Sequence, residues 1–316
     1  MAEPRVRVAV VGVGALGQHH ARVYREIAEA ELVGVFDRDS ARAKAVAERF
    51  ECAAYGRLED LIADAAAISV VVPTADHHAV GRAVLEGGRD LLVEKPMALR
   101  LEEADDLIRL AKERGSVLQV GHIERFNPAA DALRRNSAEP RFIEVHRLAA
   151  FSPRSLDVDV VLDLMIHDLD LVLTLDGSAP VQVDAVGVPV LTPKVDIANA
   201  RLRFASGLIA NLTASRVSAD RVRKFRVFSP RTYVSADFAA REAQVYRLRP
   251  GSPGGPPEIA VESTGAAGEE PLRRELQAFV QATRDRRPAV TGADGRAALA
   301  LALRVLGAMA PDRGAS

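Results

Sequence analysis

The sequence predicts an α/β protein with two different halves, a doubly wound parallel sheet followed by an α+β domain with an open, mainly antiparallel sheet. Two observations carry this prediction. The first 122 residues alternate apolar runs with amphipathic stretches, as the strands and helices of a doubly wound sheet do. After residue 175, short runs of alternating polarity between turn residues indicate an antiparallel sheet with one covered face.

The first element is a buried strand that leads directly into a glycine-rich turn and a helix. The run VRVAVVGVGALG starts at residue 6 and contains Gly12-x-Gly14-x-x-Gly17. Gly12 permits the tight turn, Gly14 lets the backbone approach a pyrophosphate, and Gly17 allows close packing of helix on strand. The free N–H groups of the helix then face the anion. A turn without a ligand is the alternative. The residues expected at the phosphates are Gly12, Gly14, Ala15, Leu16 and Gly17.

The second strand, Leu32–Phe36, ends at an acidic residue, Asp37, as a Rossmann dinucleotide-binding domain requires. A carboxylate here accepts hydrogen bonds from the ribose hydroxyls of NAD and repels the additional phosphate of NADP. Arg38 is a complication, because a guanidinium could clamp that phosphate. The pattern favours NAD over NADP.

The remainder of the first half continues the alternation. We expect helices at about 40–49, 58–63, 76–86 and 100–113, and strands at 68–72, 90–93 and 117–120. Ligands bind at the carboxyl ends of the strands in such sheets. The residues that follow these strands are therefore candidate site residues: Pro73, Thr74, His77, Glu94, Lys95 and His122.

The second half begins with a long helix expected at about 157–175. Short β-rich runs, a solvated loop at 249–268 and terminal helices at about 271–285 and 293–308 follow. We expect a dinucleotide-binding domain in residues 1–122 and a substrate-binding and oligomerisation domain in 123–316, whose terminal helices could pack back on the first. An open antiparallel sheet needs cover on its exposed face, so we expect a homodimer or homotetramer.

The global composition excludes several classes of protein. A chain of 316 residues is long enough for two domains. Its net charge of −1 and pI of about 6.7 argue against nucleic acid or an anionic membrane as partners. The single cysteine, Cys52, cannot form an internal disulfide. No secretory leader or apolar run of membrane-spanning length is visible, which predicts a cytoplasmic protein.

Further motifs follow one another in a characteristic order: Pro73-Thr74-x-x-His77, Glu94-Lys95-Pro96, Arg125-Phe126-Asn127-Pro128, Asp163-x-x-x-His167 and the terminal segment PLRRELQAFVQATRDRRPAVTGADG. With the glycine turn, they resemble the glucose-fructose oxidoreductase / inositol dehydrogenase / rhizopine catabolism (Gfo/Idh/MocA) family of NAD(P)-dependent sugar oxidoreductases. The resemblance extends over essentially the whole chain. It implies an enzyme that transfers hydride from a secondary sugar hydroxyl to the nicotinamide.

The resemblance also implies the reactive side chains. In the family, the lysine of Glu-Lys-Pro hydrogen-bonds the oxygen being oxidised, which assigns that role to Lys95, with Glu94 positioning the loop. The family's aspartate and histidine lie beside the nicotinamide, so His167 would accept the hydroxyl proton while Asp163 orients the pair. Asp163 and His167 are four residues apart, and a structural ion pair on one helix face is the alternative. No third ligand at recognisable spacing supports a metal site.

The substrate is the least determined feature. The segments GHIERFNPA, VLDLMIHDLDL, LTASRVS and RTYVSADF are similar to the bacterial UDP-N-acetylglucosamine 3-dehydrogenase group, whose keto product a partner aminotransferase converts to an amino sugar for lipid A. A free polyol such as an inositol is one alternative, and a nicotinamide-binding sensor without turnover is another. His77 is expected at the cofactor, and His122 either tunes substrate choice or packs between domains. Other candidate substrate ligands are Asn127 and the cations Arg125, Arg147, Arg154 and Arg216.

Overall fold

The structure is a computed structural model that describes residues 4–152, 158–251, 256–264 and 270–309. It divides into two compact units. Unit 1 comprises Met1–Ile123 and Glu269–Leu299, and unit 2 comprises Glu124–Gly268 and Ala300–Ser316. The division falls within helix α9 (Gly292–Ala308), and helix α8 (Pro271–Asp285) belongs to unit 1. We describe each unit by itself.

Unit 1 is built on a parallel sheet with the strand order β3-β2-β1-β4-β5-β6. Its strands are β1 (Val6–Val11), β2 (Ala30–Phe36), β3 (Ala53–Ala54), β4 (Ala67–Val70), β5 (Asp90–Glu94) and β6 (Leu118–Gly121). The helices between them are α1 (Gly17–Glu26), α2 (Ser40–Phe50), α3 (Leu58–Asp64), α4 (Thr74–Glu86) and α5 (Leu101–Arg114). The predicted doubly wound sheet is confirmed.

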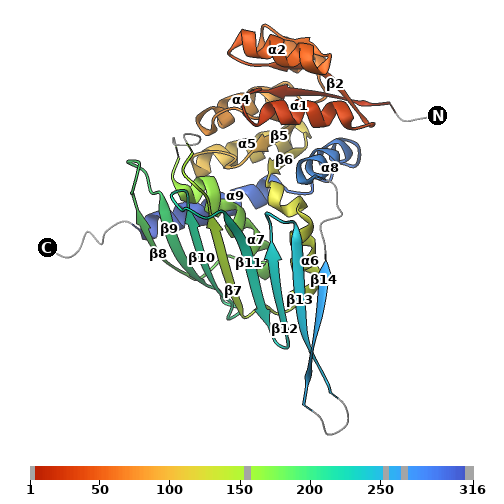
Figure 1. Cartoon of the computed structure of the whole chain (residues 1–316). Helices are drawn as coiled ribbons and strands as arrows, with labels where there is room; N and C mark the ends of the chain where they lie inside the picture. The colour runs from red at the N-terminus through yellow and green to blue at the C-terminus, as the bar shows by residue number, and fades with distance from the viewer. Residues whose placement is uncertain (1–3, 153–157, 252–255, 265–269, 310–316) are drawn as a thin grey trace, which may run out of the picture. The chain divides into compact units, whose positions relative to one another are not determined.

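Helices cover both faces of this sheet. The chain crosses in opposite directions from β1 to β2 and from β4 to β5, so right-handed crossovers place α1 and α2 on one face and α4 and α5 on the other. Helix α1 packs against α2 and α8, and α4 packs against α5 (Figure 1). Because helices cover both faces, every residue of β4 and β5 is buried, and these strands are mainly apolar, with Ser69, Asp90 and Glu94 as buried polar residues.

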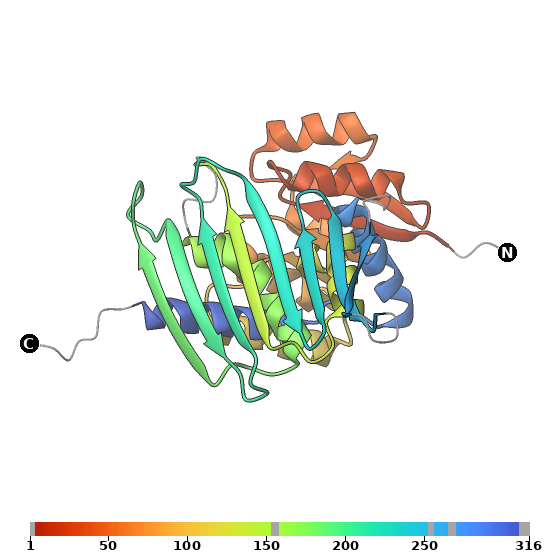
Figure 2. The same ribbon diagram turned by 60° about the horizontal axis from the view of Figure 1, so that its bottom comes forward.

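Unit 2 contains a mixed sheet with the strand order β14-β13-β12-β11-β7-β10-β9-β8. Helices α6 (Pro128–Asn136) and α7 (Ile166–Asp176) cover one face, and Figure 2 shows the other face toward the viewer. The strands are β7 (Phe142–Leu148), β8 (Gln182–Val188), β9 (Ile197–Arg203), β10 (Ile209–Ser215), β11 (Val222–Ser229), β12 (Thr232–Asp237), β13 (Glu242–Arg249) and β14 (Glu258–Thr264).

The open face of this sheet carries a row of aromatic rings. Phe142, Phe228, Tyr233 and Tyr246 stand opposite one another on β7, β11, β12 and β13. Successive ring centroids are 5.6, 4.7 and 5.1 Å apart. Such pairs stabilise neighbouring strands, and here they also form an apolar band on the face that α6 and α7 leave uncovered.

Three expectations about unit 2 were incomplete or wrong. Strand β7 was missed, although it pairs parallel with β10 and antiparallel with β11 at the centre of the sheet. The expected loop at 249–268 contains β14, an exposed strand whose turn-rich flanks hide its pairing with β13. The expected continuous helix at 157–175 is a π-helical turn, Val161–Met165, followed by α7, and residues 153–157 lie outside the described residues.

None of the helices in the described ranges combines the length and the apolar character needed to span a membrane.

Candidate functional site

The glycine turn of unit 1 has the geometry that its three glycines were expected to provide. A Cβ on Gly12 would lie 2.5 Å from the Val71 oxygen, and one on Gly17 would lie 1.8 Å from the Gly12 oxygen, so both positions are closed by the chain itself. A Cβ on Gly14 would meet no heavy atom of the described chain within 4 Å. Gly14 is therefore open on the side where a pyrophosphate would approach.

Asp37 is fixed at the end of β2 by hydrogen bonds. Its carboxylate accepts hydrogen bonds from the backbone N–H groups of Val13 and Asp39, both at 2.9 Å. It also accepts one from the guanidinium of Arg42 at 3.3 Å. The contact with Val13 joins the acidic residue to the glycine turn. The carboxylate of Asp37 is thus held in one position at the end of β2, and its contact with a ribose stays a prediction.

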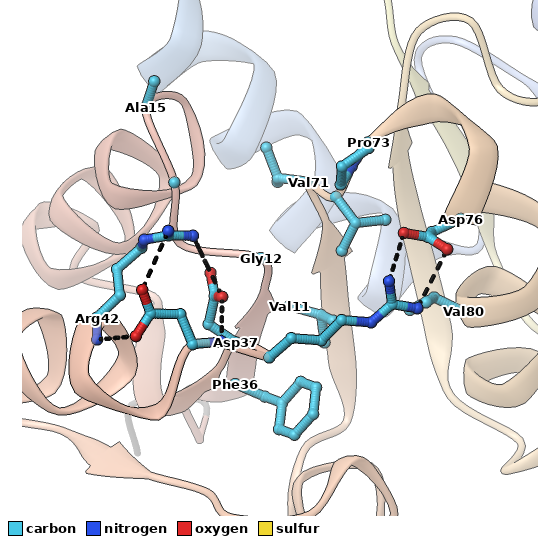
Figure 3. Close-up of a pocket in the computed structure, with 14 residues that line it drawn as sticks. Val11, Gly12, Ala15, Phe36, Asp37, Arg42, Val71, Pro73, Asp76 and Val80 are labelled. Atoms are coloured by element: carbon cyan, nitrogen blue, oxygen red, sulfur yellow. Dashed lines mark hydrogen bonds and ion pairs between the residues drawn. The ribbon is translucent and has the colours of Figure 1, made fainter. Parts of the chain in front are cut away.

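A cavity of about 500 Å³ opens beside the turn and Asp37. Residues that follow β1, β2 and β4 line it, among them Gly12, Gly14, Asp37, Arg38, Val72 and Pro73. Figure 3 shows Asp37 and Arg42 at one end of this cavity and Asp76 at the other. Its size suits a small-molecule ligand. The open glycine, the fixed carboxylate and the apolar wall make these residues fit NAD, with Gly14 at the phosphates and Asp37 at the adenosine ribose.

His77 lies outside the lining of this cavity. It is buried, with Nδ1 2.8 Å from the Pro96 oxygen and Nε2 2.9 Å from the Val72 oxygen. Burial lowers the pKa of His77, against the opposing effect of the two carbonyls. The side chain ties the loop after β4 to the Glu-Lys-Pro loop after β5, so direct cofactor contact stays a prediction.

Glu94 ends β5 in a buried polar cluster, and Lys95 follows it at the carboxyl edge of the sheet. The Lys95 N–H donates to Glu94 Oε2 at 3.3 Å, and His20 Nε2 lies 3.3 Å from Glu94 Oε1. Burial opposes ionisation of Glu94, but His20, Lys95 and His77 outweigh it and lower the pKa of Glu94. The hydrogen bond from the Lys95 N–H ties Glu94 to the loop that carries the lysine, and the expected positioning role of Glu94 stays a prediction.

A second carboxyl group, that of Glu275 on α8, is completely buried in unit 1. Neither of its oxygens has a hydrogen-bond partner among the described residues. Burial, with the nearby charge of Glu94, raises the pKa of Glu275 well above its usual value. The pKa values of these two buried carboxyl groups are thus shifted in opposite directions, upward for Glu275 and downward for Glu94. His122, after β6, is also buried in unit 1.

In unit 2, the two reactive candidates lie around the π-helical turn. Asp163 is within it, His167 is in the first turn of α7, and both are partly exposed. The apolar surroundings of Asp163 in the sequence, VVLDLMIH, predict a largely buried side chain in one continuous helix, and the partly exposed Asp163 in a π-turn corrects this prediction. Such turns occur frequently at functional sites because they redirect side chains.

The arginines expected to bind an anion are held by carboxylates instead. Arg147 donates to Asp168 at 2.7 and 2.8 Å and to Glu124 at 2.8 Å. Arg216 donates to Asp196 at 2.8 Å. Both side chains are 5% exposed. A buried guanidinium that neutralises a buried carboxylate is a structural group, so Arg147 and Arg216 were wrongly chosen as diphosphate ligands.

Arg125 and Asn127 also have contacts within unit 2. Arg125 donates to Asp170 at 2.6 and 2.7 Å. The buried Asn127 caps α6 by accepting from the Ala129 N–H at 3.0 Å and donates to the Phe238 oxygen at 3.0 Å. Their substrate roles stay predictions. Arg154 lies outside the described residues.

Arg223 is a cation that the sequence reasoning missed. It stands opposite Arg147 in the register of β11 with β7, and its side chain is 35% exposed. Its guanidinium is 3.9 Å from Glu124 Oε1, beyond hydrogen-bond distance. Burial lowers the pKa of Arg223, and Arg147 adds to this effect. The signal was in the run VRKFRVFS, where alternation places residue 223 on the covered face with Phe225 and Val227.

In the described part of the chain, no group of three or more His, Cys, Asp and Glu side chains is placed to hold a metal ion.

The chain matches known proteins over almost its full length. Residues 6–122 match the oxidoreductase family with an NAD-binding Rossmann fold (GFO/IDH/MocA), and residues 135–234 match the GFO/IDH/MocA C-terminal domain. The chain belongs to this family. The expectations of a GFO/IDH/MocA oxidoreductase and of NAD as its cofactor are thereby confirmed.

Individual relatives differ in how much of the chain they match. UDP-N-acetylglucosamine 3-dehydrogenase of Acidithiobacillus ferrooxidans is 43% identical over 95% of this chain and 96% of that protein. One crystal structure of that enzyme superposes on this chain with a TM-score of 0.91, and the match covers 97% of this chain and 98% of that one. The scyllo-inositol 2-dehydrogenase (NAD(+)) of Bacillus subtilis is 33% identical over 68% of this chain and 69% of that protein. Levoglucosan dehydrogenase, solved with NADH and levoglucosan, shares the fold at 18% identity and a TM-score of 0.87.

Proposed function

We propose that this GFO/IDH/MocA oxidoreductase oxidises the 3-hydroxyl of UDP-N-acetylglucosamine or a related nucleotide sugar with NAD. The observation that carries this proposal is the 43% identity with UDP-N-acetylglucosamine 3-dehydrogenase over 95% of the chain. The inositol dehydrogenase of Bacillus subtilis matches 68% of the chain, which makes a free polyol the second candidate.

The proposal assigns the chemistry to Lys95, Asp163 and His167. When bound, the nicotinamide accepts a hydride from the sugar carbon. His167 accepts the proton of the hydroxyl that is oxidised, Lys95 stabilises the developing alkoxide through its ammonium group, and Asp163 orients them. Two features support these roles: the anchored loop that carries Lys95 at the sheet edge of unit 1, and the π-turn that carries the other pair in unit 2.

The same proposal distributes the work between the two parts of the chain. Residues 1–122 form the cofactor-binding domain, and residues 123–316 bind the sugar and form the contacts between subunits. The apolar band Phe142–Phe228–Tyr233–Tyr246 on the open sheet face supports a homodimer or homotetramer. A cytoplasmic location and a downstream aminotransferase that serves lipid A synthesis complete the proposal, and they rest on the sequence resemblance alone.

Arg223 is the candidate ligand for the diphosphate of the substrate. It is partly exposed and more than hydrogen-bond distance from Glu124, whose Oε1 already accepts from Arg147 at 2.8 Å. Arg147 and Arg223 carry two positive charges, and Glu124 and Asp168 carry two negative charges, so the cluster is balanced. Arg147 makes the closer contacts with both carboxylates, which leaves the guanidinium of Arg223 able to bind the bidentate acceptors of a diphosphate.

To test the proposal, the purified protein is mixed with NAD and UDP-N-acetylglucosamine, and the formation of NADH is measured by its absorbance. A carbonyl trap removes the keto product and so draws the reaction forward. We expect His167→Ala and Lys95→Ala each to lower kcat by about 10²–10⁴-fold, since general acid–base assistance contributes in that range. NAD affinity, measured by calorimetry, should change little in both.

Each other outcome assigns a different function. Activity on inositol but not on the nucleotide sugar would favour the polyol dehydrogenase. Turnover retained in His167→Ala would refute its role as the base. Tight NAD binding without turnover on any sugar would favour a nicotinamide-binding sensor.

A further inference from the structure

An arginine and an aspartate face each other across the cofactor cavity of unit 1. Arg38 directly follows Asp37 after β2, and Asp76 lies in the first turn of α4. Arg38 donates to both carboxylate oxygens of Asp76, at 2.9 and 3.1 Å. Both residues line the cavity, and Figure 3 shows the Asp76 carboxylate in this pairing, on the side away from Asp37 and Arg42.

The other arginine of the cavity is also neutralised. Arg42 lies 3.3 Å from Asp37 and 3.2 Å from Asp39. The rim therefore holds two arginines that are near Asp37 in the chain, and the guanidinium of each has an acidic partner. A 2′-phosphate, which distinguishes NADP from NAD, is bound in Rossmann domains by an arginine near this position. This chain has the arginines that NADP needs, but they are engaged.

We propose that Asp76 determines cofactor selectivity: it holds Arg38 against α4 and so withdraws from the ribose site the guanidinium that would bind the 2′-phosphate of NADP. Asp76 is thus a specificity-determining residue that acts through Arg38. Asp37 repels the 2′-phosphate of NADP directly, and Asp76 keeps Arg38 from binding that phosphate.

The pair is suited to this role because it is exposed. The Arg38 side chain is 78% exposed and that of Asp76 is 27% exposed, so water screens their attraction. Exposed ion pairs are weak, and the arginine can exchange one anionic partner for another at small cost. Release of Arg38 should therefore change NADP affinity by a moderate factor, about three- to tenfold.

The experiment is calorimetric titration of the full chain with NAD and with NADP, without sugar. We expect Asp76→Ala to tighten NADP binding about three- to tenfold and to change NAD binding less than about twofold. Asp76→Asn, which keeps the side-chain shape and loses the charge, should give a smaller gain. Arg38→Ala alone should leave NADP affinity near the wild-type value, because Arg38 is already withdrawn.

The double variant Arg38→Ala/Asp76→Ala separates this mechanism from simple charge removal. If Asp76 acts through Arg38, the NADP gain disappears in the double variant. The same gain in both backgrounds, or an unchanged ratio of NADP to NAD affinity in Asp76→Ala, would overturn the proposal. Thermal unfolding of each variant identifies any loss of fold. Because no sugar is present, failure of the nucleotide-sugar proposal would leave this result unaffected.

Discussion

Two Arg–Asp pairs of nearly the same geometry occur in the two units, and they differ in burial. In unit 2, Arg147 and Asp168 meet at 2.7 and 2.8 Å, with side chains 5% and 2% exposed. In unit 1, Arg38 and Asp76 meet at 2.9 and 3.1 Å, with side chains 78% and 27% exposed. The surroundings, and not the residue types, decide what each pair does.

The buried pair cannot exchange partners. Burial opposes the charge of the guanidinium, but Asp168 and Glu124 outweigh that effect and raise the pKa of Arg147. If Arg147 were removed, Asp168 would remain as a buried charge without compensation, and if Asp168 were removed, Arg147 would keep only Glu124 as a partner. The exposed pair has water as a substitute partner, so a ligand phosphate can compete for its arginine. The buried pair Arg147–Asp168 therefore stabilises unit 2, and the exposed pair Arg38–Asp76 can respond to the cofactor.

The largest effect should come from breaking the buried pair. We expect Asp168→Asn to lower the free energy of unfolding by about 3–5 kcal/mol, because it leaves Arg147 with one charged partner instead of two. Urea unfolding measures this loss. Asp76→Asn is the matched control, and its effect should be about 1 kcal/mol or less. Equal losses in the two variants would contradict the comparison.

Arg223 is the intermediate case, a partly buried arginine beyond hydrogen-bond distance of Glu124. We expect Arg223→Ala to raise KM for the nucleotide sugar about tenfold, the loss of one charge-assisted contact, with little change in kcat or NAD affinity. Arg223→Lys, which keeps the positive charge, should raise KM less than Arg223→Ala does. Arg226→Ala is the control, because Arg226 is on the same strand and pairs with Glu144 on the open face. A KM that rises equally in the control would refute a specific role for Arg223.

Glu275 is the reverse of the buried pair, a buried carboxyl group with no arginine. Its pKa is raised in the folded protein, so between its unfolded and folded pKa values the folded state binds the proton that the unfolded state has lost. Stability from this group is fully present below about pH 4.3 and is lost as the pH rises toward the folded pKa.

Glu275→Gln should therefore stabilise the protein, because glutamine does not titrate. We expect no gain near pH 4 and a gain of about 1 kcal/mol or more at pH 7, since one pKa unit corresponds to about 1.4 kcal/mol. Unfolding in urea at both pH values measures it. Glu48→Gln, at an exposed position on α2, is the control and should show no such pH dependence. A gain independent of pH would mean that Glu275 does not titrate as described.

The cofactor half was predictable because its signals are local. The strand, the three glycines and Asp37 are neighbours in the chain, and each requirement is set by backbone sterics or by position at a strand end. The same reasoning missed β7 and β14, whose places in the sheet depend on pairing with distant strands. It also assigned Arg147 and Arg216 to a ligand, since the carboxylates that hold them are 20 to 23 residues away.

The sequence by itself determined the doubly wound sheet, the glycine turn, the acidic residue at the end of β2 and the family. These follow from periodicity and from short-range geometry. The tertiary structure alone decided which charged side chains are available to a ligand. It places Arg147 inside unit 2, Arg38 at the cavity rim against Asp76, and the buried Glu275 close enough to Glu94 to raise its own pKa. The physical reason is that burial and partner choice are set by contacts between distant segments, and residue type does not encode them.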